Sequence, residues 1–266
     1  MRNRYSYIFR REVFWQIWLK KTAVPLLLLL CWQGVFLAAW VKPLLLPSPQ
    51  TVAKTFCALA ASGELVVHLQ ISLQRVVEGF FIAAILGISM GLALGMSSFA
   101  FSLLEGILQI LRPIPPIAWL PMAILWFGIE EGSKIFIIAL GSFFPVFINV
   151  LDGVRQTDAR FVELAKVFEV PRWKFLVFIL WPGTLPYIVA GLRIGLGYAW
   201  MCVVAAELSA GMQGIGYFLT DARALLQTDR VLAAMLSIGL IGKSMDWLLK
   251  KIEKKVSPWK EVYTGQ

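Results

Sequence analysis

Histidine and cysteine, which supply many metal sites and all disulfide bonds, are scarce in this sequence. One histidine and three cysteines occur among 266 residues. The cysteines are Cys31, Cys57 and Cys202; their number is odd, two lie in apolar segments, and their spacing matches no disulfide framework or metal site. His68 stands alone before an apolar segment, and we interpret it as a surface or interfacial residue. We therefore expect no metal centre.

Residues for catalysis and for nucleotide binding are also missing. With one histidine, no nucleophile elbow and no paired carboxylates inside the apolar segments, intramembrane catalysis is excluded. The string GLIGKS at residues 239–244 suggests a P-loop, but Ser237 stands where that motif needs its first glycine. We interpret Lys243 as an anchor at the end of an apolar helix. The chain is thus expected to be no enzyme and to hold no cofactor, so a separate subunit must hydrolyse ATP if transport is active.

Acidic residues are outnumbered, and the net charge is +9. In a soluble protein this excess would suggest nucleic acid, but the sequence has no aromatic RNA-binding motif and no Cys/His finger. Its basic residues gather at the ends of apolar segments, which is the pattern of membrane topology. Nucleic acid is therefore not an expected partner, whereas membrane lipid is.

Apolar residues are abundant. They make up 59% of the chain, and the mean hydropathy is +0.74, which is far above soluble proteins. We predict one all-α polytopic membrane domain over 22–250, between a basic N-terminus at 1–21 and a basic tail at 251–266. Six transmembrane helices are expected, over about 22–41, 76–97, 107–127, 135–150, 187–206 and 231–249. Residues 99–106 are expected to form a turn, and short helices are expected over 51–59 and 217–226.

Two of these spans carry further signals. Gly87, Gly91 and Gly95 recur every four residues in the second span, a spacing that lets helices approach closely. Pro145 is expected to bend the fourth span. The glycine repeat therefore predicts close packing of the second span against another helix.

Lysine and arginine are divided unequally between the two sides of the membrane. Segments that would lie on one side of the membrane are residues 1–21, 152–174 and 243–260. Together they carry nearly three times as many basic residues as the segments that would lie on the other side. Cytoplasmic loops are the ones that are rich in lysine and arginine. Both termini and the segment 152–186 are therefore predicted to face the cytoplasm.

The largest charged island between the spans begins near Asp158. Phe161, Leu164, Ala165 and Phe168 follow helical spacing and form one apolar stripe, while the intervening residues are mostly charged. Pro171 ends the helix, because the residue before a proline avoids helical geometry. Such a helix could rest on lipid headgroups or could enter a groove on a soluble partner. Both interpretations stay open on the residues alone.

The third span contains the proline-rich string RPIPPIAWLP at residues 112–121. Prolines free backbone carbonyls, and within a membrane these need protein or water as partners. The string therefore predicts either a broken helix that lines a pathway or a structural kink. Arg112 and Arg193 are the charges that remain inside spans; each could help an anion through, or could make a buried structural contact with carbonyls or a carboxylate.

Several strings resemble permeases of ATP-binding-cassette (ABC) importers. Glu163-Leu164-Ala165 and, at matching spacing, Ile179-Leu180-Trp181-Pro182 resemble the cytoplasmic loop of these permeases. Leu164, Glu169 and Trp181 depart from that pattern. Glu169 replaces a glycine that usually separates two helices, so we expect Pro171 to supply the bend. LRPIPPIAWLP, LWFG, GLRIGLGYAW and VVAAEL, within residues 65–260, resemble the taurine, sulfonate and nitrate group of this family.

The resemblance implies a type I ABC importer permease fold with a cytoplasmic coupling helix in the bacterial inner membrane. It implies a homodimeric pore, two ATPase subunits that bind ATP and Mg, and a soluble solute-binding protein outside the cell. Import would occur by alternating access, for taurine or an aliphatic sulfonate, with nitrate, bicarbonate or a small heterocyclic precursor as alternatives. The implied ATPase-coupling residues are Arg160, Glu163, Leu164, Ala165, Phe168, Glu169 and Pro171. The implied pathway residues are Arg112, Pro115, Pro116 and Arg193.

Two other classes of function were weighed against this one. A channel or secondary transporter without an ATPase would need coupling-ion sites, usually intramembrane carboxylates, and the middles of the spans lack them. A membrane scaffold that transports nothing is the second alternative. Copurification of an ATPase with the chain would separate both alternatives from an importer permease.

Overall fold

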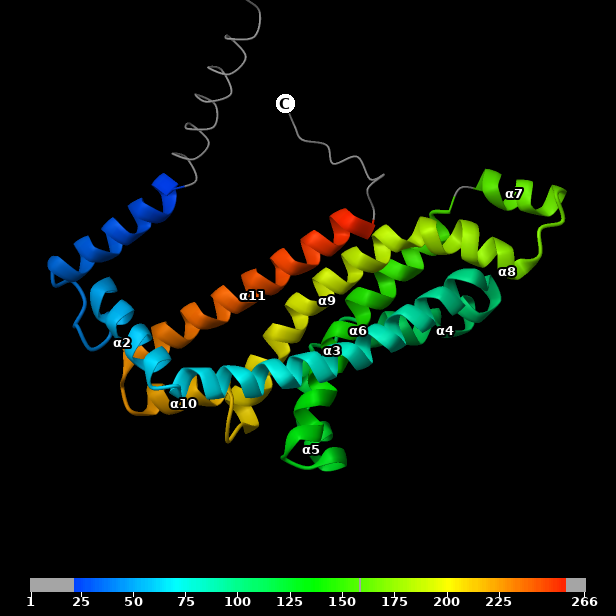
Figure 1. Ribbon diagram of the computed structural model, residues 1–266. Coiled ribbons are helices and arrows are strands. Elements are labelled where there is room, and N and C mark those ends of the chain that lie inside the picture. The colour runs from blue at the N-terminus through cyan, green and yellow to red at the C-terminus, as the bar shows by residue number, and fades with distance from the viewer. Residues whose placement is uncertain (1–21, 158, 257–266) are drawn as a thin grey trace, which may run out of the picture.

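The computed structural model describes residues 22–157 and 159–256, and this part of the chain contains helices and no strand. Four long helices, α3, α6, α9 and α11, run side by side as an elongated bundle (Figure 1). Helices α2 and α10 cover one end of it, and α7 and α8 lie at the other. The helices are α2 Pro49–Ala61, α3 Glu64–Met96, α4 Ser98–Leu111, α5 Leu120–Phe127, α6 Glu131–Arg155, α7 Ala159–Val167, α8 Arg172–Phe175, α9 Trp181–Ala210, α10 Ile215–Ala224 and α11 Thr228–Val256. The predicted segments 1–21 and 257–266 lie outside the described residues.

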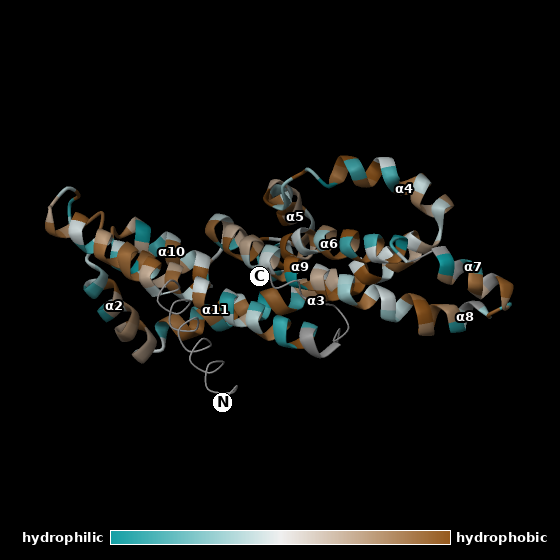
Figure 2. Ribbon diagram, turned by 90° about the horizontal axis from the view of Figure 1, so that it is seen from above, coloured by the Kyte–Doolittle hydropathy of each residue, from teal (hydrophilic) through white to brown (hydrophobic). Residues whose placement is uncertain are grey.

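The apolar helices agree with a membrane domain. Within the described residues, four are long and apolar enough to cross a membrane: Glu64–Met96, Glu131–Arg155, Trp173–Ala210 and Thr228–Glu253. The predicted first span coincides with a shorter apolar helix, Thr22–Leu37. Brown, hydrophobic residues recur along these helices (Figure 2), and many of their large apolar side chains are exposed, as expected where lipid is the solvent.

The predicted third span is different from what we expected. Residues 99–106 do not form a turn, because they belong to α4, which continues to Leu111. A break follows, then a short 3-10 helix at Pro116–Trp119 and α5, and the two halves meet at 89°. The reason is chemical: Pro113, Pro115 and Pro116 lack the amide hydrogens that would continue α4. The span is thus broken and not merely kinked.

Most of the other helices extend beyond at least one of their predicted ends. The segment 152–186 was expected to be a loop with one short helix, but its first residues belong to α6, and from Arg172 onward the chain is helical again. The predicted tail likewise begins inside α11. The predictions stopped at charged residues and at prolines. A helix tolerates proline in its first turn, and several of the charges turn out to be buried and paired.

Helices α3, α6 and α9 form the centre of the bundle. A methyl group on Gly79, Gly91 or Gly95 of α3 would come within 2.7 Å of a β-branched side chain of α6 (Ile138, Val150 and Val154, respectively), and one on Gly87 within 2.9 Å of Val146. The close packing predicted from the glycine repeat is therefore confirmed. On α9, Gly191 and Gly195 meet Asn149 and Val146 of α6 in the same way.

Candidate functional site

Helix α7 extends from the bundle at the end where α3 and α6 finish, which we call the α7 end (Figure 1). Its predicted apolar stripe is real but faces outward. Phe161, Leu164, Val167 and Phe168 are between 51% and 76% exposed, and Ala165 alone of the stripe is buried. Arg160 and Glu163 are also exposed. The helix thus presents a small apolar surface with charged neighbours that its own chain does not cover.

The turn after α7 differs from our expectation. Glu169 has φ +48°, in the left-handed region that favours glycine, and it stands where related loops have glycine. The amide of Val170 reaches back to the carbonyl of Ala165 at 2.8 Å and closes the helix end. Pro171 then accepts a hydrogen bond from the Lys174 amide and opens α8. Glu169 therefore supplies the bend, and Pro171 supplies the start of the next helix.

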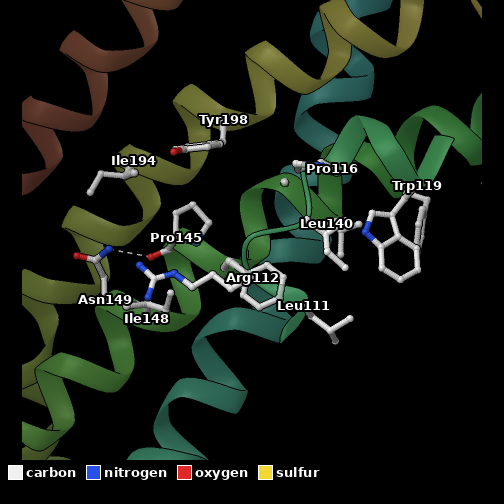
Figure 3. Close-up of a pocket in the computed structure, with 14 residues that line it drawn as sticks. Leu111, Arg112, Pro116, Trp119, Leu140, Pro145, Ile148, Asn149, Ile194 and Tyr198 are labelled. Carbon is white, nitrogen blue, oxygen red and sulfur yellow. Dashed lines mark hydrogen bonds between the residues drawn. The ribbon is translucent and has the colours of Figure 1, made fainter. Parts of the chain in front are cut away.

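A cavity of about 400 Å³ lies beside the broken span (Figure 3). It is lined from α4, the break, α6 and α9, and most of the lining is aromatic or aliphatic. Leu111, Ile114, Pro116, Trp119, Phe136, Leu140, Gly141, Phe144, Pro145, Ile148 and Ile194 form these walls. The polar lining residues are Arg112, Asn149 and Tyr198. The cavity is thus an apolar chamber with one cation.

Arg112 reaches into this chamber toward Asn149 and Pro145 (Figure 3). No hydrogen bond or ion pair holds its guanidinium among the described residues. Asn149 is oriented, because its Nδ2 donates to the Pro145 carbonyl at 2.8 Å. Pro145 itself lacks an amide hydrogen, so the Gly141 carbonyl on the same wall loses its helical donor. The broken span therefore lines a cavity, as one of the two sequence interpretations expected.

Arg193 lies elsewhere and makes different contacts. Its Nε is 2.5 Å from Oδ1 of Asp246 on α11, and Glu253 lies 3.8 Å from its Nη1. Lys250 also pairs with Asp246, at 2.8 Å. Arg193 does not line the chamber that holds Arg112 and Pro116, and Pro115 lies just before the 3-10 helix. The geometry agrees with the structural alternative for Arg193, namely contact with a carboxylate.

The sequence predictions missed a buried polar cluster at the opposite end of the bundle, which we call the Glu207 end. Arg75 of α3 holds both carboxylate oxygens of Glu131 at 2.6 Å and one oxygen of Glu207 at 2.7 Å. It also donates to the Gln213 carbonyl at 2.8 Å. Arg75 and Glu207 are 3% and 1% exposed, so this is a charge cluster inside the protein.

The loop before α10 closes around Glu207. Ser72 donates to both carboxylate oxygens, and the Gly216 amide donates to one of them at 2.8 Å. A side chain at Gly214, where φ is +106°, would place its Cβ 2.3 Å from the carboxylate. Arg75 and Glu207 each lie one residue outside a predicted span, 76–97 and 187–206 respectively. The available signals were Ser72 and Arg75 one helical turn apart, and glycines close to the end of VVAAEL.

Residues 83–258 match the family described as "Binding-protein-dependent transport system inner membrane component". The chain belongs to this family. It is accordingly a multi-pass membrane permease of ABC importers. The recognition based on its sequence strings is confirmed.

Curated relatives place this permease within the sulfonate, taurine and nitrate group. It is 40% identical to the "Putative aliphatic sulfonates transport permease protein SsuC" of Bacillus subtilis, over 93% of this chain and 90% of that protein. It is 37% identical to the "Taurine transport system permease protein TauC" of Escherichia coli, over 87% and 86% of the two chains. The "Nitrate import permease protein NrtB" of a Synechocystis strain is 36% identical, over 72% and 70%.

Solved structures support the fold. An inward-facing MetNI methionine ABC transporter aligns with a TM-score of 0.57 at 16% identity, over 69% of this chain and 94% of that one. An amino acid ABC transporter crystallised with histidines gives the same TM-score and identity, over 75% and 95%. The predicted fold class, an all-α ABC importer permease, is therefore confirmed.

Proposed function

We propose that this permease carries a small organic anion, such as taurine or an aliphatic sulfonate, into the cytoplasm by alternating access. A separate ATPase, docked on α7, would drive the change. The observation that carries the proposal is the cavity beside the broken span, in which one unpaired arginine faces apolar walls. The relatives named for sulfonates and taurine support the same class of solute.

The composition of the cavity selects among anions. Arg112 offers several donors to a sulfonate, and a charge-assisted hydrogen bond of this kind contributes about 1.5–3 kcal/mol. Nitrate and bicarbonate have no carbon chain that could contact the aromatic and aliphatic walls, whereas an organic anion has one. The chamber thus favours an anion with an apolar body. Nitrate is the alternative that the NrtB relative suggests.

The exposed surface of α7 supports the docking of an ATPase. A helix that leaves four large apolar side chains at least half exposed, next to Arg160 and Glu163, suits a groove on a soluble partner. In this arrangement the α7 end faces the cytoplasm, together with both termini. Two copies of the permease, two ATPases that bind ATP and Mg, and a solute-binding protein on the far side would complete the importer.

Uptake by the reconstituted importer tests the proposal. The permease, its ATPase and its binding protein are placed in liposomes, and uptake of taurine, an alkanesulfonate and nitrate is compared. We expect the organic anions to be preferred. Arg112→Gln should lower their uptake about tenfold or more, since it removes one charge-assisted hydrogen bond.

Arg223→Gln serves as the matched control, because Arg223 is exposed and lies outside the chamber. It should transport normally. Normal uptake by an assembled Arg112→Gln complex would exclude the anion role of Arg112, and a preference for nitrate would exclude the organic substrate. Failure of an ATPase to copurify with the permease would overturn ATP-driven import itself.

A further inference from the structure

A single helical rod connects the two ends of the molecule. It extends from Trp173 to Ala210, with α7 attached before its first turn and Glu207 in its last. The rod changes its hydrogen-bond pattern once, at Leu176–Leu180, where it forms a π-helical turn. There the Trp181 amide bonds to the Leu176 carbonyl, five residues back. Such wide turns are rare and weaken the helical ladder locally.

Prolines weaken the same region further. Pro182 lies two residues after the π turn, and Pro186 lies one helical turn later. Neither has an amide hydrogen, so each removes one donor from the ladder. Between them, the hydroxyl of Thr184 is buried and has no hydrogen-bond partner. A buried polar group without a partner is unusual, and here it stands beside backbone that lacks donors.

Side chains of the rod are mostly exposed up to this region, and after it the rod packs closely against α6. Trp173 before the π turn and Val177 and Phe178 within it are between 53% and 68% exposed, whereas Leu180 at its end and much of α9 from Thr184 onward are buried. The fixed part is held by direct backbone approach to α6. A methyl group on Gly153 of α6 would lie 2.6 Å from Tyr187, and one on Gly191 of α9 would lie 2.9 Å from Asn149. The transition from free to fixed coincides with the π turn and Pro182.

Space is present next to the π turn. An apolar cavity of about 440 Å³ separates it from the last turns of α3, between Leu92 and Met96 on one side and Leu176, Val177, Leu180 and Trp181 on the other. Closely packed interiors resist displacement, whereas a cavity of this size allows the free part of the rod to move toward α3. The irregular helical turn, the change from exposed to packed side chains and the adjacent cavity thus occur at one place along the rod.

We propose that Leu176–Leu180 and Pro182 form the hinge through which movement of α7 reaches α9. This rests on the proposed docking of an ATPase at α7. When the ATPase displaces α7, the segment before the hinge closes against Leu92 and Met96. The part after the hinge follows as a rigid unit with α6 and so changes the walls of the Arg112 chamber, which both helices line. Pro182 is a positioning residue in this scheme and contacts no solute.

Restoring the missing donor tests the hinge. Pro182→Ala gives the ladder an amide hydrogen and should stiffen the joint. In the reconstituted importer we expect ATP hydrolysis to continue while the solute imported per ATP falls about fivefold or more. Pro186→Ala restores a donor inside the fixed part and should leave this ratio unchanged. If Pro182 had a purely structural role, Pro182→Ala would lower ATP hydrolysis and solute uptake together. The solute imported per ATP would then be unchanged, and that result would overturn the hinge.

Reversible cross-linking across the cavity gives a second test that does not depend on a substitution at proline. Cysteines replace Leu92 and Val177 in a chain whose three native cysteines are changed to alanine, and a short cleavable bifunctional reagent joins them. Uptake should stop while ATP hydrolysis persists, and reductant should restore uptake. Full uptake in the cross-linked importer would exclude the movement. If instead substitutions on α7 never affect ATPase association, the docking proposal fails and the hinge with it.

Discussion

The two ends of this permease differ in whether their side chains find partners within the chain. At the Glu207 end, every strong charge that is buried finds partners within the chain, and three helices and a loop converge on one arginine. At the α7 end, apolar side chains are exposed, one residue is held in a left-handed conformation, and the helix that leads back into the bundle is irregular. One end is complete as a single chain, and the other has the features of a surface that a partner completes.

The largest expected effect on stability comes from removing the buried cation at the Glu207 end. Arg75→Met leaves Glu207 buried without its cation, and uncompensated buried charges cost about 3–5 kcal/mol. We expect the variant to lose most of its folded population, measured by thermal unfolding in detergent. Glu131→Gln should cost much less, because the Glu131 side chain is 56% exposed and water can replace part of the interaction. Equal losses of stability in the two variants would contradict the expectation that Arg75 matters more than Glu131.

The next effect concerns the packing that connects the two ends. A methyl group on Gly91 would lie 2.7 Å from Val150 and 3.0 Å from the Phe147 carbonyl, so Gly91→Ala forces α3 and α6 apart. Such overpacking costs about 1–3 kcal/mol. Gly106→Ala on α4 is the control, because nothing lies within 4 Å of its added carbon. A stable Gly91→Ala variant would show that the two helices separate easily.

A substitution on α7 should affect association and not folding. Leu164 is 51% exposed, so Leu164→Arg should change the stability of the isolated permease by less than about 0.5 kcal/mol. We expect ATPase affinity, measured by binding to immobilised permease, to fall about tenfold or more. Ala165→Arg would disturb folding as well, because Ala165 is buried. Unchanged affinity of Leu164→Arg would remove α7 as the docking surface.

The smallest effect relieves strain at the α7 end. Glu169→Gly replaces a side chain at φ +48° with the residue that tolerates this conformation, and it should stabilise the chain by about 0.5–1 kcal/mol. Glu169→Ala keeps a Cβ at the same φ and should give no gain. Calorimetry or thermal unfolding distinguishes the two. Equal stability of all three chains would mean that the turn carries no strain.

Features that depend on local chemistry could be predicted from the sequence. The glycine repeat predicted the α3–α6 contact, the proline string predicted a broken span, and the charged island predicted α7. The proline string left a kink open as well, and only the structure shows the break. These signals are properties of short segments, because glycine and proline act directly on the backbone. The family also followed from short strings, some of which lie in the proline-rich segment and in α7 and others in α9.

Features that depend on distant partners could not be predicted. Arg75, Glu131 and Glu207 appear in the sequence as charges near span ends, and only the fold shows that they meet. For Arg193 the sequence allowed a carboxylate partner, but only the fold identifies it as Asp246. Glu169 was misjudged because the proline two residues later seemed a sufficient cause of the bend. Helix ends were placed too early, since a paired charge does not end a helix in the way a solvated one does.

The cluster around Arg75 also sets an order of events during biosynthesis. Arg75 leaves the ribosome 132 residues before the carboxylate that receives its Nη1 donor. Helix α3 therefore enters the bilayer with its guanidinium unsatisfied by Glu207, and α6, α7 and nearly all of α9 must be translated before that partner arrives. Glu131 follows Arg75 after 56 residues and is the first of its carboxylate partners to be translated. Before Glu131 arrives, water, lipid phosphates or the insertion machinery must accept the charge, and the cluster is completed only when the end of α9 is made.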